Sequence, residues 1–211
     1  MIRSFFDAIK RRIKLLFFNK KHPNLLCFYK DIIYNNVIDK GVGNKIIIGK
    51  NSCLMNCSIV FNGTRCVLEI KDNIRISDVV FWFEDEGGII SISSGTTIEG
   101  GCQFASVEGK NVVIGEDCMF SHNVDVRTSD SHSILNVEGN RINPGEDVII
   151  GNHVWIGIRT TILKGVRIAD NCVVAACSLV SSKTESKENT IIAGVPAVIV
   201  KNNINWDRKR L

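Results

Sequence analysis

The sequence lacks most features that mark secreted, membrane-spanning or nucleic-acid-binding proteins. Its eight cysteines include no Cys-x-x-Cys pair, which excludes a zinc ribbon. It shows no cleavable signal with a small-residue site, so we expect reduced cysteines in a cytoplasmic protein and not a disulfide framework. The net charge is only +4 over 211 residues. Such a mild excess is compatible with an anionic ligand and gives no indication of nucleic-acid binding.

Apolar residues in the first 20 positions follow a helical spacing, and lysine and arginine stand between them. The apolar positions on one helical face are Ile2, Phe5, Phe6, Ile9, Ile13, Leu16 and Phe17. Arg3 and the segment Lys10 to Lys14 place cations mostly on the other face, which argues against a membrane-spanning helix. We predict an N-terminal amphipathic helical segment over residues 1–40. It either packs on the rest of the molecule or rests through residues 2–17 on the inner face of the cytoplasmic membrane.

A six-residue period dominates the C-terminal half. The aliphatic positions are Ile150, Ile156, Ile162, Ile168, Val174 and Val180. A smaller residue stands two places before each: Val148, Val154, Thr160, Val166, Cys172 and Ser178. A helix repeats near 3.6 and a strand near 2, so six is typical of very short strands separated by turns, with three such hexads completing one triangular coil. We expect the aliphatic residue inside the coil and the small one at the corner beside it.

Four motifs carry a resemblance to a known family: Ile150-Gly151-Asn152-His153-Val154-Trp155, Ile156-Gly157, Val166-Arg167-Ile168 and Ala193-Gly194-Val195-Pro196-Ala197. Together they resemble the hexapeptide-repeat acyltransferases over roughly residues 110 to 201. The resemblance implies an all-β fold, a left-handed parallel β-helix, which we assign to residues 41–200. A basic C-terminal tail, residues 201–211, follows it.

The period is less regular before residue 110. From Gly43 it gives Ile48, Leu54 and Val60 as inward residues, and it then resumes in a new phase. The phase shifts predict longer corners near Asn62-Gly63 and Glu84-Gly88. The strict pattern returns at Val112, Ile114, Cys118, Phe120, Val124 and Val126. It then stops, and residues 127–147 are rich in polar residues, Gly and Pro, which predicts a loop excursion from the coil.

His132 lies in this excursion, within Asp130-Ser131-His132-Ser133-Ile134. The resemblance implies that His132 is the catalytic general base. A hydroxyl attacks a thioester efficiently at neutral pH only if its proton leaves as the bond forms, and an imidazole can accept it. Asp130 or a backbone carbonyl could orient the ring. We expect His122 and His153 to face outwards within their hexads.

Acetyl-CoA is the co-substrate that the resemblance implies, and no metal is expected. Trp155 corresponds to the tryptophan near the thioester, where it would help to fix the reacting geometry. A backbone N–H near Gly157 would stabilise the oxyanion. The sequence departs from the family where Val174-Ala175-Ala176-Cys177-Ser178 replaces a glycine-containing segment. The further cofactor-binding candidates are Ala176, Ser178, Ser181, Lys183 and Lys201.

The acceptor side is less specific. By resemblance, the acceptor should line the cleft beneath the His132 loop. The candidates there are Gln103, Glu108 and Asn123, each of which could equally be a solvated corner residue. Arg141, in the excursion, could contact an acidic sugar.

Two segments, the loop Asp130-Ser131-His132-Ser133-Ile134 and the ending Asn203-Ile204-Asn205-Trp206, most resemble the capsular polysaccharide and sialic-acid O-acetyltransferases. We therefore expect direct acetyl transfer from acetyl-CoA to a hydroxyl of a bacterial cell-surface carbohydrate, in a homotrimer whose sites lie between subunits. Sugar-nucleotide N-acetyltransfer and antibiotic acetylation are the nearest alternatives. A γ-type carbonic anhydrase using His122, His132 and His153, or a non-catalytic scaffold, are remoter ones.

Overall fold

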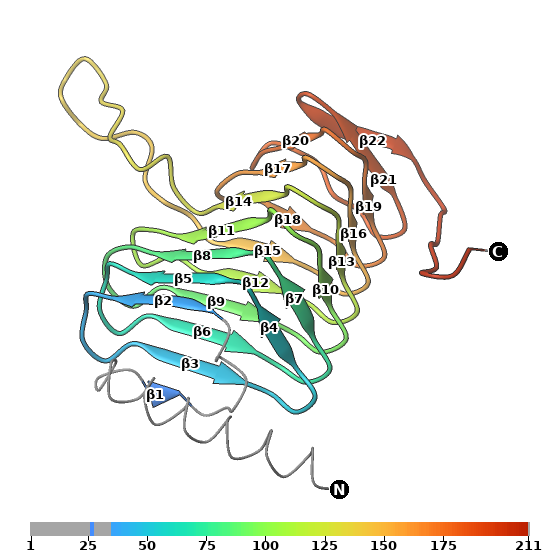
Figure 1. Cartoon of the computed structure of the whole chain (residues 1–211). Helices are drawn as coiled ribbons and strands as arrows, with labels where there is room; N and C mark the ends of the chain where they lie inside the picture. Colours follow the sequence, from blue (N-terminus) through green and yellow to red (C-terminus); the bar gives the residue numbers. More distant parts are fainter. Residues whose placement is uncertain (1–25, 28–34, 211) are drawn as a thin grey trace, which may run out of the picture.

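The computed structural model describes residues 26–27 and 35–210, which form a triangular prism of three parallel sheets (Figure 1). Most of the helical segment predicted over residues 1–40, including residues 2–17 and His22, lies outside the described residues. Where this segment is described the helical prediction is wrong, because Leu26–Cys27 and Asn36–Asp39 are strands paired with the first coils. No helix in the described part of the chain is long and apolar enough to cross a membrane. The all-β, left-handed parallel β-helix that the resemblance implied is confirmed.

The chain visits the three sheets in a fixed order, which we number I, II and III. Sheet I contains β1 (Leu26–Cys27), β3 (Lys45–Ile48), β6 (Val67–Ile70), β9 (Ile89–Ile92), β12 (Val112–Ile114), β15 (Val148–Ile150) and β18 (Arg167–Ile168). Sheet II contains β4 (Cys53–Met55), β7 (Arg75–Ser77), β10 (Thr97–Ile98), β13 (Met119–Phe120), β16 (Trp155–Ile156), β19 (Val173–Val174), β21 (Ile191–Gly194) and β22 (Ala197–Lys201). Sheet III contains β2 (Asn36–Asp39), β5 (Ser58–Phe61), β8 (Val80–Phe83), β11 (Gln103–Ser106), β14 (Asp125–Arg127), β17 (Thr161–Ile162) and β20 (Leu179–Val180). Among the strands of the described residues, β22 alone is antiparallel to its neighbour, β21.

The inward residues of the hexads form the core, as predicted. Ile150, Ile156, Ile162 and Val174 are at most 1% exposed, and the small residues Val154 and Thr160 are equally buried. Because these side chains stack from coil to coil, they fill the prism with a continuous apolar column.

Coil length changes along the chain. In the N-terminal half, stacked residues are mostly 22 apart, as in Lys45 and Val67, because the corner between sheets III and I is longer than a hexad turn. The last coils repeat at 18, as in Asn152 and Asp170. The longer corners predicted near residues 62 and 84 are therefore confirmed, and all lie on the III/I edge.

One inward assignment was wrong. Val60 points outwards from β5 and stands outside the core cluster, whereas its neighbours Ile59 and Phe61 are fully buried within it. The register explains the shift, since Phe61 pairs with Phe83 and their rings stack at 4.7 Å. The phase moves at the corner between sheets II and III, where the inward Ile59 follows Leu54 after five positions and not after the six of a regular hexad.

The cysteines are mainly core residues. Cys57, Cys66, Cys102, Cys118 and Cys172 are buried free thiols, as expected. Burial raises the pKa of Cys57, Cys102 and Cys118 to about 11, which keeps these thiols protonated and unreactive. Cys177 differs from the expectation of burial because it stands at an exposed turn.

Candidate functional site

The excursion leaves the prism at the III/I edge, between β14 and β15 (Figure 1). Glu108 anchors the excursion where it joins the prism. Its carboxylate accepts two hydrogen bonds from the Arg141 guanidinium, at 2.9 and 2.5 Å. It also accepts from the Ser129 hydroxyl and from the Gly145 N–H. The hydrogen bonds from Arg141 and then Ser129 lower the pKa of Glu108 to about 2. Glu108 and Arg141, which we had assigned to the acceptor, are thus paired with each other.

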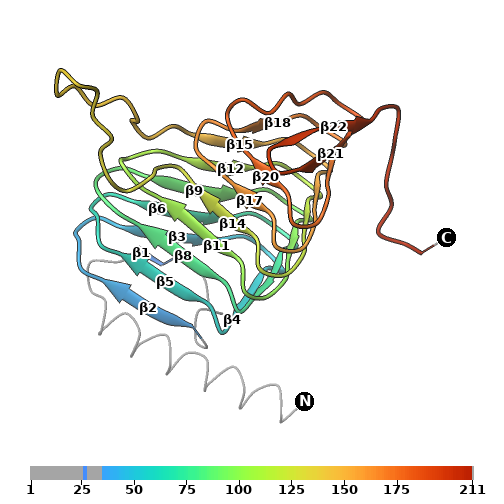
Figure 2. The ribbon, with the colours of Figure 1, turned by 90° about the horizontal axis from the view of Figure 1, so that it is seen from above.

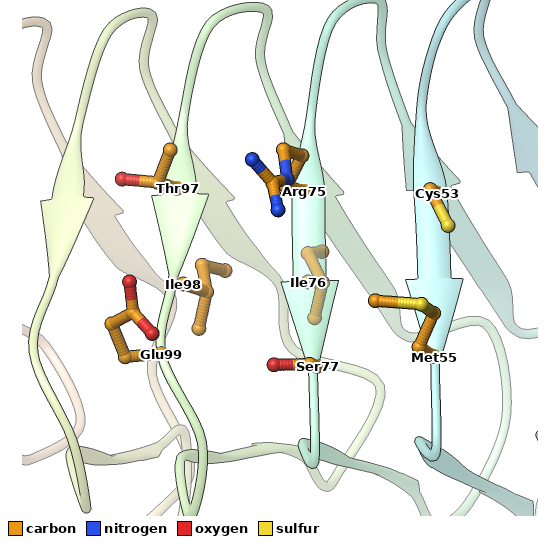
Figure 3. Close-up of a pocket in the computed structure, with 8 residues that line it drawn as sticks. All are labelled: Cys53, Met55, Arg75, Ile76, Ser77, Thr97, Ile98 and Glu99. Atoms are coloured by element: carbon orange, nitrogen blue, oxygen red, sulfur yellow. The ribbon is translucent and has the colours of Figure 1, made fainter.

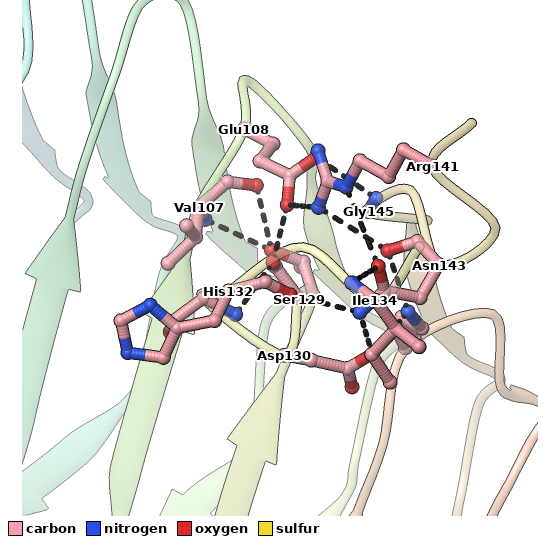
Figure 4. A network of polar contacts seen from close by, with 12 residues as sticks. Val107, Glu108, Ser129, Asp130, His132, Ile134, Arg141, Asn143 and Gly145 are labelled. Carbon is pink, nitrogen blue, oxygen red and sulfur yellow. Dashed lines mark hydrogen bonds and ion pairs between the residues drawn. The ribbon is translucent and has the colours of Figure 1, made fainter. Parts of the chain in front are cut away.

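Asn143 organises the interior of the excursion (Figure 4). Its side-chain oxygen accepts from the Ile134 N–H at 2.7 Å, and its amide nitrogen donates to Asp130 and to the His132 carbonyl at 2.8 and 2.9 Å. Only 8% of Asn143 is exposed, so these bonds are largely shielded from water. One amide side chain therefore fixes the backbone at His132 and Ile134 and the side chain of Asp130.

The His132 imidazole is exposed and directed away from this network (Figure 4). Within residues 35–210 the structure gives its ring no hydrogen-bond partner. Asp130 does not orient it, because the Asp130 carboxylate binds Lys164 Nζ at 2.5 Å as well as Asn143. The hydrogen bond from Lys164, followed by that from Asn143, lowers the pKa of Asp130. Lys164 thereby ties the excursion to the prism, and the imidazole stays available to a ligand.

Trp155 begins β16 on the outer face of sheet II, and 37% of it is exposed. Its indole N–H lies 3.4 Å from the Ser121 hydroxyl. Two positions after Trp155, Gly157 lies in register with Ala175 and Ala193 on the neighbouring coils. These three small residues form a row on the outer face of sheet II, next to the row that contains Trp155. A Cβ on Gly157 would lie 2.5 Å from the backbone nitrogen of Ala176, so only glycine fits there. The Gly157 N–H donates to the Val174 carbonyl and is not free to bind an oxyanion.

The remaining cofactor candidates divide between exposed and internal positions. Ala176, Lys183 and Lys201 are exposed. Ser178 is buried, and its hydroxyl donates to the Ala175 carbonyl and accepts from the Gly194 N–H, so it holds the last coils together. Ser181 caps a turn through its backbone N–H, which donates to Thr184 Oγ1.

Two acceptor candidates have different surroundings. Asn123 occupies a corner with φ of 59°, a conformation that asparagine tolerates better than most residues. Gln103 lines a hollow of about 270 Å³ on sheet III, close to the excursion. The hollow is bounded by Trp82, Glu84, Gln103, Ala105, Val107, Arg127 and Ser131.

A second polar cluster, formed with the C-terminal tail, was not expected from the sequence. Trp206 stacks on His153 with ring centroids 4.1 Å apart, and its indole N–H donates to the His153 carbonyl. His153 in turn contacts Asp117 at 2.7 Å, and the Arg208 guanidinium reaches the other oxygen of that carboxylate. Partial burial would raise the pKa of Asp117, but hydrogen bonds from His153 and Arg208 lower it. The resemblance of the ending Asn203-Ile204-Asn205-Trp206 drew attention to this tail but did not predict its contact with His153.

The structure does not bring His132 and Trp155 together within one chain. His132 projects from the III/I edge, whereas Trp155 starts a sheet II strand beside the I/II edge, where the C-terminal tail runs (Figure 2). Histidines are equally dispersed, with His122 at a third edge, 3.2 Å from the Gly100 carbonyl. Across the described residues, no three His, Cys, Asp or Glu side chains converge as metal ligands would.

Comparison with known proteins gives consistent matches. The family model described as bacterial transferase hexapeptide (six repeats) matches residues 147–182. The polysialic acid O-acetyltransferase of Neisseria meningitidis is 40% identical over 170 residues, which cover 80% of this chain and 78% of that protein. The solved structure of the polysialic acid O-acetyltransferase OatWY superposes with a TM-score of 0.69 at 32% identity, covering 89% of this chain and 92% of the other. The polysialic-acid-specific acetyltransferase NeuO gives the same TM-score at 28% identity, covering 83% and 90%.

Proposed function

This chain belongs to the hexapeptide-repeat transferases, and we propose that it transfers acetyl from acetyl-CoA to a hydroxyl of a bacterial cell-surface glycan. The acceptor class is a capsular polysaccharide or sialic-acid-type sugar. The observation that carries the proposal is the similarity to a polysialic acid O-acetyltransferase along four fifths of the chain. The exposed imidazole of His132, held on a fixed backbone, supplies the chemistry that such a transfer needs.

In the proposed reaction, a glycan hydroxyl attacks the thioester carbonyl while the His132 imidazole accepts its proton. The new C–O bond gives a tetrahedral intermediate. When the C–S bond breaks, the coenzyme A thiolate leaves and takes up the proton from the imidazolium. The product is the acetyl ester, and no covalent enzyme intermediate forms. Trp155 would pack beside the thioester end of acetyl-CoA, and the small residues Gly157, Ala175 and Ala193 leave room for the cofactor arm along sheet II.

We further propose that the working form is a homotrimer. A single chain holds His132 and Trp155 at different edges of the prism, so a neighbouring chain must supply one of them to complete a site. The free, buried thiols and the use of acetyl-CoA favour a cytoplasmic location. Contact with the inner membrane face through residues 2–17 stays a proposal that the described residues do not address.

Thiol release from acetyl-CoA tests the function. A panel of sialylated, neutral capsular and amino-sugar acceptors is assayed with wild type and with His132→Ala. We expect release with a glycan acceptor, reduced roughly 10²- to 10⁴-fold in the variant, while acetyl-CoA binding is unchanged. His122→Ala is the matched control, since that imidazole is exposed at another edge. Near-normal turnover in His132→Ala would remove it from the mechanism. Absence of acetyl-CoA binding would overturn the transferase proposal.

A further inference from the structure

The outer face of sheet II contains a second hollow, in the N-terminal coils (Figure 3). Its volume is about 190 Å³. It is lined by Cys53, Met55, Arg75, Ile76, Ser77, Thr97, Ile98 and Glu99. Ile76 and Ile98 belong to the core of the prism, and the transfer chemistry described above uses none of the other lining side chains.

The hollow lies in line with the proposed cofactor wall. Thr97 pairs in register with Met119, which pairs with Trp155, and Arg75 is one strand further from them. At a strand spacing of about 4.8 Å, Thr97 is roughly 10 Å and Arg75 roughly 14 Å from the Trp155 position. A ligand extended along sheet II would therefore pass from the thioester position into this hollow.

The two ends of the hollow differ in charge. Arg75 is exposed, and its guanidinium has no ion-pair partner in the described part of the chain. The Arg208 guanidinium adds a second cation at the same end, since it donates to Thr97 Oγ1 at 2.8 Å, although Asp117 partly neutralises it. Ser77 and Glu99 lie at the other end, in the row that continues to Gly157. The cationic end suits a carboxylate, and the other end offers acceptors for sugar hydroxyls.

We propose that this hollow binds a carboxylated sugar of the acceptor glycan, with the carboxylate on Arg75 and hydroxyls on Ser77 and Glu99. Met55, 47% exposed, provides the apolar contact for the sugar ring. The inference rests on the proposed function and makes it more specific, because it requires an acidic polymer bound along sheet II. A bound residue here would hold a neighbouring residue of the same polymer near Trp155.

Arg75→Gln tests the subsite, because it removes the charge and keeps the length of the side chain. Acceptors are a sialic acid oligomer and the same oligomer with its carboxylates converted to methyl esters. For the acidic oligomer we expect KM to rise roughly tenfold, the loss expected for a charge-assisted hydrogen bond. The ester should bind wild type and variant equally weakly. Arg167→Gln, which removes an exposed guanidinium from sheet I, is the control and should leave both values unchanged.

Calorimetric binding of the acidic oligomer, measured beside transfer, separates the two proposals. Transfer with an unchanged KM in Arg75→Gln, an equal rise in Arg167→Gln, or transfer to neutral glycans alone would overturn the subsite and leave the transferase standing. Arg75-dependent binding without acetyl transfer to any acceptor would support the subsite and overturn the proposed function. If wild type neither binds nor acetylates the acidic oligomer, the subsite is wrong, and turnover of other acceptors then decides the function.

Discussion

At the residue scale, the position of His132 depends on a carboxylate that never needs to touch substrate. Glu108 stands in the corner before β12 and binds three parts of the excursion, through Ser129, Arg141 and Gly145. The bidentate geometry makes the pairing with Arg141 directional as well as electrostatic. One side chain thereby fastens a long loop to a rigid prism.

Glu108→Gln should loosen the excursion without unfolding the protein. The amide keeps the size of the side chain but loses the charge and one acceptor, so the ties to Arg141 and Gly145 weaken. We expect faster hydrogen exchange across residues 129–145 and a lower kcat, with exchange in the core strands unchanged. Glu138→Gln, an exposed residue within the excursion, is the control. Equal exchange in Glu108→Gln and wild type would show that the loop is held by other contacts.

The ion pair between Glu108 and Arg141 makes the stability of the excursion depend on pH. The pKa of Glu108 falls from 4.5 to about 2 in the fold, so its stabilising contribution is fully present above about pH 4.5 and is lost as the pH falls towards 2. Hydrogen exchange of the excursion should therefore be flat from neutral pH to about 4.5, after correction for intrinsic rates, and then rise. Partial exposure of the pair keeps the effect modest.

The sequence identifies His132 as a candidate base but does not predict the contacts that hold the excursion around it. His132 was identifiable because the hexad period stops around it, leaving one histidine in an irregular segment. The contact between Glu108 and Arg141 was not, because 33 residues separate them and both charges sit in segments that would be solvated in most folds. The stacking of Trp206 on His153 was unpredictable for the same reason, because the two residues are 53 positions apart.

At the element scale, tight corners force many residues into the left-handed region. Asn and Asp supply most of the non-glycine positions, such as Asn51, Asn171 and Asn189, because their short polar side chains tolerate this conformation. Cys177 does so with φ of 58° at an exposed turn, where it stands in place of a residue better suited to that conformation.

Cys177→Asn should stabilise the protein by about 0.5 to 1 kcal/mol, because it relieves part of the left-handed penalty. The shift is measured from urea unfolding at fixed protein concentration. The control is Ala176→Asn, at the neighbouring exposed position without a positive φ, which should give no gain. A gain of equal size at both positions would point to a general surface effect.

The regular coils were predictable and the longer ones only partly so. A strict period of six fixes both the inward face and the coil length between Ile150 and Val180, since every corner there has the same size. Before residue 112 the corners differ in length, so a period of six slips: Ile59, and not Val60, follows Leu54 into the core. The corner length depends on packing between successive turns such as those at Gly63 and Asp85, which lie one coil apart.

At the scale of the whole molecule, the fold separates the two halves of the proposed chemistry. The excursion and the C-terminal tail leave the prism on different sides (Figures 1 and 2). A rigid prism cannot bend to bring these edges together, because its core is a continuous packed column. The sequence alone could list His132 and Trp155 as candidate site residues, but only the order of the sheets shows that they lie at different edges of the prism.

Subunit mixing tests this arrangement. His132→Ala and Trp155→Ala chains are each expected to be nearly inactive as homotrimers. When they are denatured and refolded together in equal amounts, an interface that joins His132 of one chain to Trp155 of another regains both groups. Random assembly of a cyclic trimer restores about a quarter of the sites. Thiol release should therefore recover to about that fraction of wild type, whereas mixing either variant with the double variant should recover none. If each site draws both residues from one chain, the mixture stays inactive, and a monomer in light scattering would contradict the composite site directly.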